Sequence, residues 1–142
     1  MSFISKNFTQ VFVYGTLKPG ECNDWVIRDH VVATCPAISL GQLFSLPLGY
    51  PAMTPGNDFI QGVLLSFRDS SILAILDAFE QHDPQEFARH APGLILQQNQ
   101  YQRHAIAVFT PSHQLLGTAW AYLMTPEQID RLDGTLLPGG RW

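Results

Sequence analysis

The stretch Val11–Gly20 reads VFVYGTLKPG and determines the expected start of the fold. Its β-branched and aromatic beginning predicts a short buried strand that stops at Gly15. The residues that follow have glycine at both ends and Pro19 between them, which predicts a loop with tight turns. Such a loop can point backbone N–H groups at a carboxylate or phosphate, and Thr16 adds a hydroxyl. The spacing matches neither a P-loop nor a dinucleotide fingerprint. On these residues alone an ordinary strand-to-helix turn is favoured over an anion site.

The composition describes a folded chain with few charges. It has 142 residues, of which 46% are apolar and 14% charged, with a formal net charge of −4. A chain of this length buries about two-thirds of its unfolded surface, so it needs no disulfide or metal to fold. The 8 Lys and Arg residues are spread from Lys6 to Arg141, so we expect no nucleic-acid partner. No apolar run approaches the roughly 18 residues of a membrane span, so we expect no membrane partner.

Metal, disulfide and serine chemistry are not indicated. The 5 His residues show no HxH or HExxH spacing, so we expect no metal site. A GxSxG elbow for a serine nucleophile is missing. Cys22 and Cys35 stand alone, which favours two free, buried thiols in a reducing compartment. With no signal peptide visible over 1–10, we expect a cytoplasmic location.

Hydrophobic patterning predicts a mixture of strands and helices. The expected strands are 11–14, 33–48, 59–68, 101–110 and 115–124, and the expected helices are a short one at 25–27, then 72–84 and 126–133. A loop dense in Gly and Pro is expected over 49–56, and another over 134–142. Strands and helices do not alternate strictly, so an α+β fold with a mixed sheet fits best. We expect one domain over 1–142, with the polar segment 82–100 as an insertion.

Glu80 lies at the edge of the apolar stripe that the helix over 72–79 presents. At 100° per residue it is about 70° from the centre of that stripe, whereas Asp77 lies further round, towards solvent. Partial burial would raise the pKa of the Glu80 carboxyl, which suits a general acid or base. The residues alone favour the alternative, a solvated glutamate or one paired with Arg103 or Arg89.

Further motifs follow the first one in a set order. The segments are VYGTLKPG at 13–20, GYPAM at 49–53, LDAFE at 76–80, YQR at 101–103 and AYLMT at 121–125. In this order they resemble the γ-glutamylcyclotransferase-like superfamily, in its γ-glutamylamine cyclotransferase-like (AIG2-like) branch. The resemblance spans about 11–125, which is most of the chain. It reverses the preference for an ordinary turn after the first strand and for a solvated Glu80.

The resemblance implies an α+β fold built around a small mixed β-barrel, closed or nearly closed, with flanking helices. A pocket at one mouth of the barrel would take the γ-glutamyl head of a small-molecule substrate. Glu80 would be the general acid/base, and Tyr122 would line the pocket beside the head group. The residues implied to hold the α-carboxylate are Tyr14, Gly15, Thr16 and Leu17. The resemblance implies no metal and no cofactor, and it leaves the oligomeric state open.

The activity implied is conversion of a γ-glutamyl amide or amine to 5-oxoproline, with release of the free amine or amino acid. Two departures concern the segment after Glu80. Gln81 stands where the family commonly has glycine, and the 20 residues between Glu80 and Tyr101 exceed the usual connection. The alternative is therefore a non-catalytic module that binds a γ-glutamyl compound or another carboxylate metabolite in the same pocket.

Overall fold

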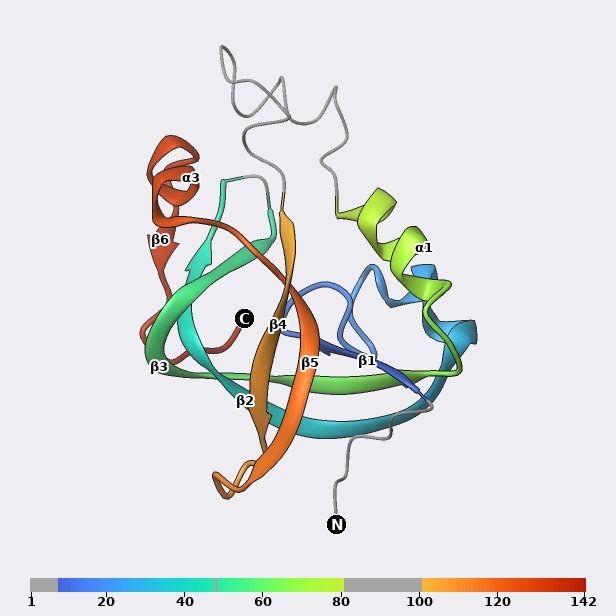
Figure 1. Cartoon of the computed structure of the whole chain (residues 1–142). Helices are drawn as coiled ribbons and strands as arrows, with labels where there is room; N and C mark the ends of the chain where they lie inside the picture. Colours follow the sequence, from blue (N-terminus) through green and yellow to red (C-terminus); the bar gives the residue numbers. More distant parts are fainter. Residues whose placement is uncertain (1–7, 48, 81–100) are drawn as a thin grey trace.

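The computed structural model describes residues 8–47, 49–80 and 101–142 (Figure 1). The strands are β1 (Thr9–Val13), β2 (Val31–Ser45), β3 (Pro51–Phe67), β4 (Gln102–Phe109), β5 (Leu115–Leu123) and β6 (Thr135–Leu136). The helices are α1 (Ile72–Phe79) and α3 (Pro126–Arg131), with two 3-10 turns, η1 (Asp24–Val26) and η2 (Arg28–His30). The α+β class predicted from the sequence is confirmed. Where a short helix is expected at 25–27, the structure has only one turn of 3-10 helix, η1.

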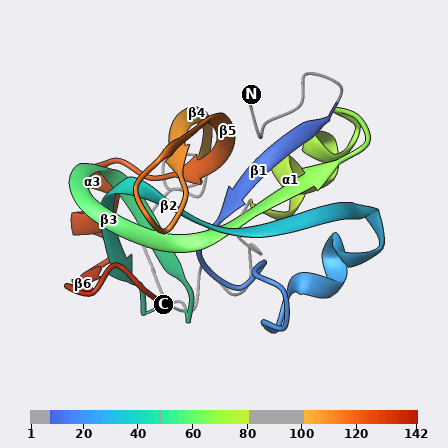
Figure 2. The ribbon, with the colours of Figure 1, turned by 90° about the horizontal axis from the view of Figure 1, so that it is seen from below.

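The strands form one mixed sheet that nearly closes into a ring. β2 and β3 pair antiparallel along almost their whole length, and β1 pairs antiparallel with the second half of β3. β4 and β5 form a hairpin that joins the rest at three short contacts. β4 pairs with β2 at Ile38–Phe109 and Ser39–Val108, and β5 pairs with β1 at Val11–Trp120 and with β3 at Met53–Leu123. Figure 2 shows β2 and β3 side by side across the molecule, with the β4–β5 pair on one side of them. The predicted mixed, nearly closed sheet is confirmed.

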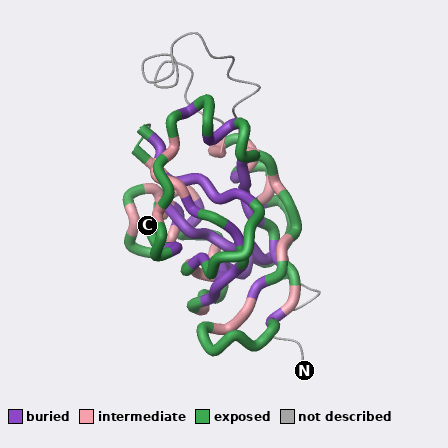
Figure 3. The backbone as a smooth tube through the Cα atoms, turned by 90° about the vertical axis from the view of Figure 1, so that its left-hand side faces the viewer, coloured by how far each residue is buried: buried purple, intermediate pink, exposed green. Residues whose placement is uncertain are grey.

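The apolar core divides into two main clusters because successive residues of a strand point to opposite faces. Phe12 belongs to the cluster that contains Leu43, Met53 and Leu64. Its neighbours Val11 and Val13 belong to the second cluster, which joins β1, β3 and β5 to α1 and to the loop after β1. Figure 3 shows the buried residues concentrated in the middle of the molecule. The second cluster fixes the elements around the candidate site.

The predicted loop over 49–56 is largely wrong, because β3 begins at Pro51. Proline is tolerated at the first position of a strand, where its missing N–H breaks no ladder. Further along, the β2–β3 register shifts between Gly41, which pairs with Asp58, and Gln42, which pairs with Thr54. The residues 55–57 are left outside the pairing, and Pro55 falls among them. Pro51 is therefore the first residue of a strand and Pro55 lies in a bulge, and a strand accepts proline at both kinds of position.

The loop predicted over 134–142 is interrupted by the two-residue strand β6. β6 pairs with the end of β2 at Phe44–Leu136 and Ser45–Thr135. The tail thereby covers part of an edge that would otherwise expose unpaired backbone groups. α1 and α3 are shorter than expected, ending at Phe79 and Arg131. The predicted insertion over 82–100 lies outside the described residues.

Both cysteines are free, as predicted, but Cys22 is exposed rather than buried, because it lies in the loop between β1 and η1. Over the described ranges, no helix has the length and apolar character needed to cross a membrane.

Candidate active site

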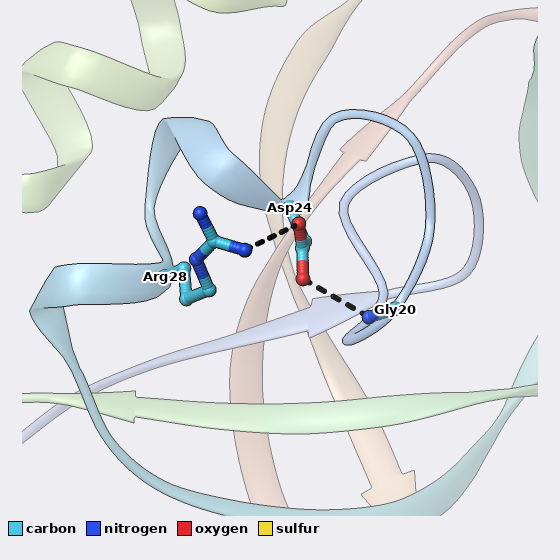
Figure 4. Close-up of polar contacts among 3 residues, drawn as sticks. All are labelled: Gly20, Asp24 and Arg28. Carbon is cyan, nitrogen blue, oxygen red and sulfur yellow. Dashed lines mark hydrogen bonds and ion pairs between the residues drawn. The ribbon is translucent and has the colours of Figure 1, made fainter.

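The loop that follows β1 is built from two consecutive turns. The Lys18 N–H donates to the Gly15 carbonyl at 3.0 Å, and the Glu21 N–H donates to the Lys18 carbonyl at 2.9 Å. Asp24 closes the loop, because its Oδ2 accepts from the Gly20 N–H at 3.0 Å while its Oδ1 lies 3.8 Å from Arg28 (Figure 4). The loop therefore has a defined shape. Among the hydrogen bonds found within the described residues, none uses the N–H of Thr16 or Leu17.

Gly15 lies where the loop packs against the start of β3. A Cβ atom on Gly15 would come within 2.7 Å of Pro51 Cγ and 3.0 Å of Pro51 Cδ. Glycine is required here because any side chain would push the two segments apart. The Pro51 carbonyl in turn accepts a hydrogen bond from the Tyr101 hydroxyl at 2.5 Å. The loop, the start of β3 and the start of β4 thus meet at one point.

Tyr14 is buried and its hydroxyl is engaged within the protein. It donates to the Tyr122 carbonyl at 2.5 Å and accepts from the Met53 N–H at 3.3 Å. Burial raises the pKa of Tyr14, and the charge of Glu80 raises it further. The hydroxyl therefore stays neutral and ties the first residue of the loop to β3 and β5.

Glu80 caps the C-terminal end of α1, where its N–H donates to the Leu76 carbonyl at 2.8 Å. The residue is half-buried, and burial of the carboxyl raises its pKa from 4.5 to about 8. A carboxylate gains nothing from this end of a helix dipole. Within the described residues its carboxyl has no ion pair or hydrogen bond. Of the two partners named in the alternative interpretation, Arg103 faces Asp77 instead, and Arg89 lies outside the described residues.

Three tyrosines lie near enough to Glu80 for its charge to raise their pKa values. They are Tyr14, Tyr101 and Tyr122, and for each of them burial is the larger cause. Leu17 joins the same region through the second cluster, in which it lies with Leu76 and Tyr122. Of the predicted residues, the structure thus brings Glu80 together with Tyr14 and Tyr122, and it links the loop to them through Leu17.

Tyr122 has both its polar groups engaged. Its hydroxyl donates to Asp77 Oδ1 at 2.6 Å, while its carbonyl accepts from Tyr14. Burial and the hydrogen bond to Asp77 both raise the pKa of the Tyr122 hydroxyl. Tyr122 therefore connects α1 on one side with the loop on the other.

Tyr101 and Asp77 belong to the site but have no assigned role in the sequence analysis. The Tyr101 ring lies 6.3 Å from that of Tyr50, and the Tyr101 hydroxyl reaches the start of β3. A tyrosine in an apolar strand needs a partner for its hydroxyl, so the sequence position of Tyr101 already indicates such a contact. The sequence does not indicate a role for Asp77 in the site, because its place on the helical wheel points to solvent. The Asp77 side chain is indeed 46% exposed, but it is also the acceptor for Tyr122 and faces Arg103.

A separate hollow of about 500 Å³ lies between β3, β4 and the end of β5. Its walls include Met53, Ile106, Leu123 and Thr125, and none of the predicted site residues lines it. Over the described ranges no group of three or more His, Cys, Asp and Glu side chains could hold a metal ion.

The sequence matches the model of the family described as gamma-glutamyl cyclotransferase, AIG2-like, over residues 11–142. The chain belongs to this family, which the motif segments predict. Membership supports a γ-glutamyl cyclotransferase-like activity in general terms. A comparison with curated protein sequences finds no match.

Solved structures share the fold. YkqA from Bacillus subtilis has a TM-score of 0.65 at 21% identity; the match covers 95% of this chain but only 39% of YkqA. An AIG2-like protein from Mus musculus has a TM-score of 0.65 at 20% identity, over 96% of this chain and 88% of that one. A gamma-glutamyl cyclotransferase has a TM-score of 0.54 at 19% identity, over 83% of this chain and 67% of that one. At these identities the likeness establishes the fold alone.

Proposed function

We propose that this protein is a cyclotransferase that converts a γ-glutamyl amide or amine to 5-oxoproline, with Glu80 as its general acid/base. The observation that carries the proposal is the state of the Glu80 carboxyl. It is half-buried, its pKa is raised to about 8, and its charge raises the pKa of Tyr14, the first residue of the glycine loop. Strongly shifted pKa values of this kind cluster at catalytic sites.

The raised pKa suits the proton transfers that the reaction needs. Proton transfer between groups of matched pKa is nearly balanced, and an α-amino group has a pKa of about 8. The Glu80 carboxylate takes a proton from the substrate's α-ammonium. The freed amine attacks the γ-carbonyl carbon, and the bond from that carbon to the leaving nitrogen breaks as the five-membered lactam closes. The protonated Glu80 gives its proton to the leaving nitrogen. The new ring nitrogen then loses its second proton, again through the Glu80 carboxylate, to the released amine, which departs as an ammonium ion, so that the lactam keeps one N–H and Glu80 ends as a carboxylate.

In the proposed function, the loop after β1 binds the substrate's α-carboxylate. We place the substrate's α-carboxylate against Tyr14, Gly15, Thr16 and Leu17, with the N–H groups of Thr16 and Leu17 as donors. Backbone N–H groups in such concave loops hold anions. Because the attack is intramolecular, holding the γ-glutamyl chain in a folded pose supplies much of the acceleration. In this arrangement Tyr122 lies beside the head group.

The test is release of 5-oxoproline from a panel of γ-glutamyl amino acids, γ-glutamyl amines and glutathione. Glu80→Gln is nearly isosteric and should lower kcat by about 10²- to 10⁴-fold, the usual contribution of a general acid/base. The matched control is Glu127→Gln, an exposed glutamate in the first turn of α3, which should keep wild-type activity.

Binding measured by thermal shift separates this function from the binding-module alternative. A ligand that binds the folded chain raises its melting temperature whether or not it is turned over. Stabilisation by γ-glutamyl compounds with no 5-oxoproline from the wild-type protein would assign the pocket to binding alone. Equal turnover by the wild type and Glu80→Gln would remove Glu80 from the mechanism.

A further inference from the structure

A chain of contacts crosses three elements beside the candidate site. Asp77, on α1, accepts from the Tyr122 hydroxyl through Oδ1 at 2.6 Å, and its Oδ2 lies 3.6 Å from Nη1 of Arg103 on β4. The Arg103 guanidinium carbon lies 5.0 Å from the centre of the Trp120 ring, at cation–π distance. The Asp77 carboxylate is thus held from two strands at once.

α1 depends on tertiary contacts. The helix has only 8 residues, and helices this short are marginal without such contacts. Its buried residues Ile72 and Leu76 and the half-buried Phe79 pack against the second cluster, and Asp77 adds a polar contact. Asp77 follows Leu76 and precedes Glu80 by three positions, which makes Asp77 and Glu80 neighbours on the helix surface. The polar contact of Asp77 therefore acts on the turn that carries Glu80.

Tyr122 extends the chain of contacts to the glycine loop. Its hydroxyl binds Asp77, and its carbonyl accepts from Tyr14, whose hydroxyl also accepts from the Met53 N–H. Tyr122 thus contacts both the end of α1 and the first residue of the loop. We propose that Asp77 is a positioning residue, which acts through the Tyr122 hydroxyl to hold Glu80 at a fixed distance from the loop. The catalytic meaning of this role rests on the function proposed above for Glu80.

A merely stabilising role for Asp77 makes a different prediction. The side chains of Arg103 and Asp77 are 30% and 46% exposed, and exposed ion pairs add little to stability. A merely stabilising role would therefore rest on the hydrogen bond from Tyr122, and removing the Asp77 carboxylate would lower the melting temperature and leave kcat unchanged. If Asp77 positions Glu80, the same change should lower kcat, because a small misplacement of a reacting group can cost about 100-fold in rate.

The experiment breaks the Asp77–Tyr122 hydrogen bond from each side. Asp77→Ala removes the acceptor, and Tyr122→Phe removes the donor without altering any charge. Each should lower kcat at least about tenfold, with KM within about threefold and the double variant no worse than the worse single one. Asp77→Asn keeps an acceptor for Tyr122 and should retain most of the activity. Asp130→Asn, an exposed carboxylate on α3, is the control.

A second readout does not depend on activity. Burial raises the pKa of the Glu80 carboxyl, so a displacement of Glu80 towards solvent should lower it in both Asp77→Ala and Tyr122→Phe. Carbon NMR of the labelled side chain measures this pKa. Such a fall in a protein without cyclotransferase activity would support the positioning role while rejecting the proposed function. A Glu80 pKa and a kcat unchanged in both variants would overturn the proposal. If Asp77→Ala fails to fold, Tyr122→Phe decides the question alone.

Discussion

The ionisation of Glu80 opposes folding at neutral and alkaline pH. Its pKa is about 8 in the folded protein and 4.5 when the group is solvated. Between these pH values the folded chain keeps a proton that the unfolded chain has released. The contribution of Glu80 to stability is therefore fully present below about 4.5, falls as pH rises towards 8 and is constant above it.

We predict that Glu80→Gln becomes more stable relative to the wild type as pH rises from 4.5 to 8, by at most about 1.4 kcal/mol per pH unit. Other titrating groups contribute equally to both proteins and cancel in the difference. Urea unfolding of the two proteins at several pH values from 4 to 9 measures it. A difference that stays flat over this range would mean that the Glu80 carboxyl is not buried enough to shift its pKa.

The contact between Gly15 and Pro51 gives a second prediction at the scale of single residues. The methyl group of Gly15→Ala would lie 2.7 Å from Pro51 Cγ, so the loop or β3 must move. We expect a loss of about 1–3 kcal/mol in unfolding free energy, the usual cost of overpacking, together with weaker substrate binding. Chemical denaturation and KM measure the two effects.

Pro51→Ala tests whether this contact is the cause. It removes Cγ and Cδ but keeps the carbonyl that accepts from Tyr101. The double variant Gly15→Ala, Pro51→Ala should be less destabilised than the sum of the two single variants. Additive losses would show that Gly15 is needed for another reason.

At the scale of elements, α3 illustrates what local sequence determines. Thr125 Oγ1 accepts from the Gln128 N–H at 3.2 Å, and Gln128 Oε1 accepts from the Thr125 N–H at 2.8 Å. With Pro126 in the first turn, this is a complete capping box. The helix start is predicted from the sequence because all its determinants lie within four consecutive residues.

We predict that Thr125→Ala lowers the free energy of unfolding by about 1 kcal/mol, because the Gln128 N–H loses its acceptor. Thr125→Ser keeps a hydroxyl at the same place and should lose much less. Thermal or urea unfolding of both variants beside the wild type measures the effect. Equal losses in the two variants would assign the effect to the Thr125 methyl group instead.

Pairing between distant segments explains what the sequence leaves open. Pro51 and Pro55 favour a loop locally, yet the register of β3 on β2 places them at tolerated strand positions. The near closure follows from the family resemblance rather than from local patterns, and the strand order is known only from the structure. Within the site, the position and partial burial of Glu80 are readable from helical spacing. The acceptor role of Asp77 is not, because its partner Tyr122 is 45 residues away.

At the scale of the whole molecule, the tail over 134–142 forms hydrogen bonds that connect several parts of the ring. The Leu137 N–H donates to the Leu43 carbonyl at 2.7 Å, and the Gln61 N–H donates to the Gly140 carbonyl at 2.7 Å. Trp142 packs against the cluster inside the ring, and in Figure 1 the last residues lie within the outline of the ring. The tail thus joins β2, β3 and the interior.

Lys18 connects the tail to the glycine loop. Its Nζ donates to the backbone oxygen of Trp142 at 2.8 Å. A displaced tail should therefore affect the loop as well as the stability of the ring.

Gly140 and Gly139 provide a matched pair to test the role of the tail. Gly140 has φ +63°, and a Cβ there would lie 2.0 Å from the Phe59 carbonyl oxygen, whereas a Cβ on Gly139 would meet nothing within 4 Å. Gly140→Ala should cost about 1–3 kcal/mol of unfolding free energy from the backbone conformation alone, and more from the collision. Gly139→Ala should stay within about 0.5 kcal/mol of the wild type. Because the tail reaches Lys18, Gly140→Ala should also raise KM for the γ-glutamyl substrate. Equal stability and KM in the two variants would mean that the tail only covers the ring, without holding it or the loop in place.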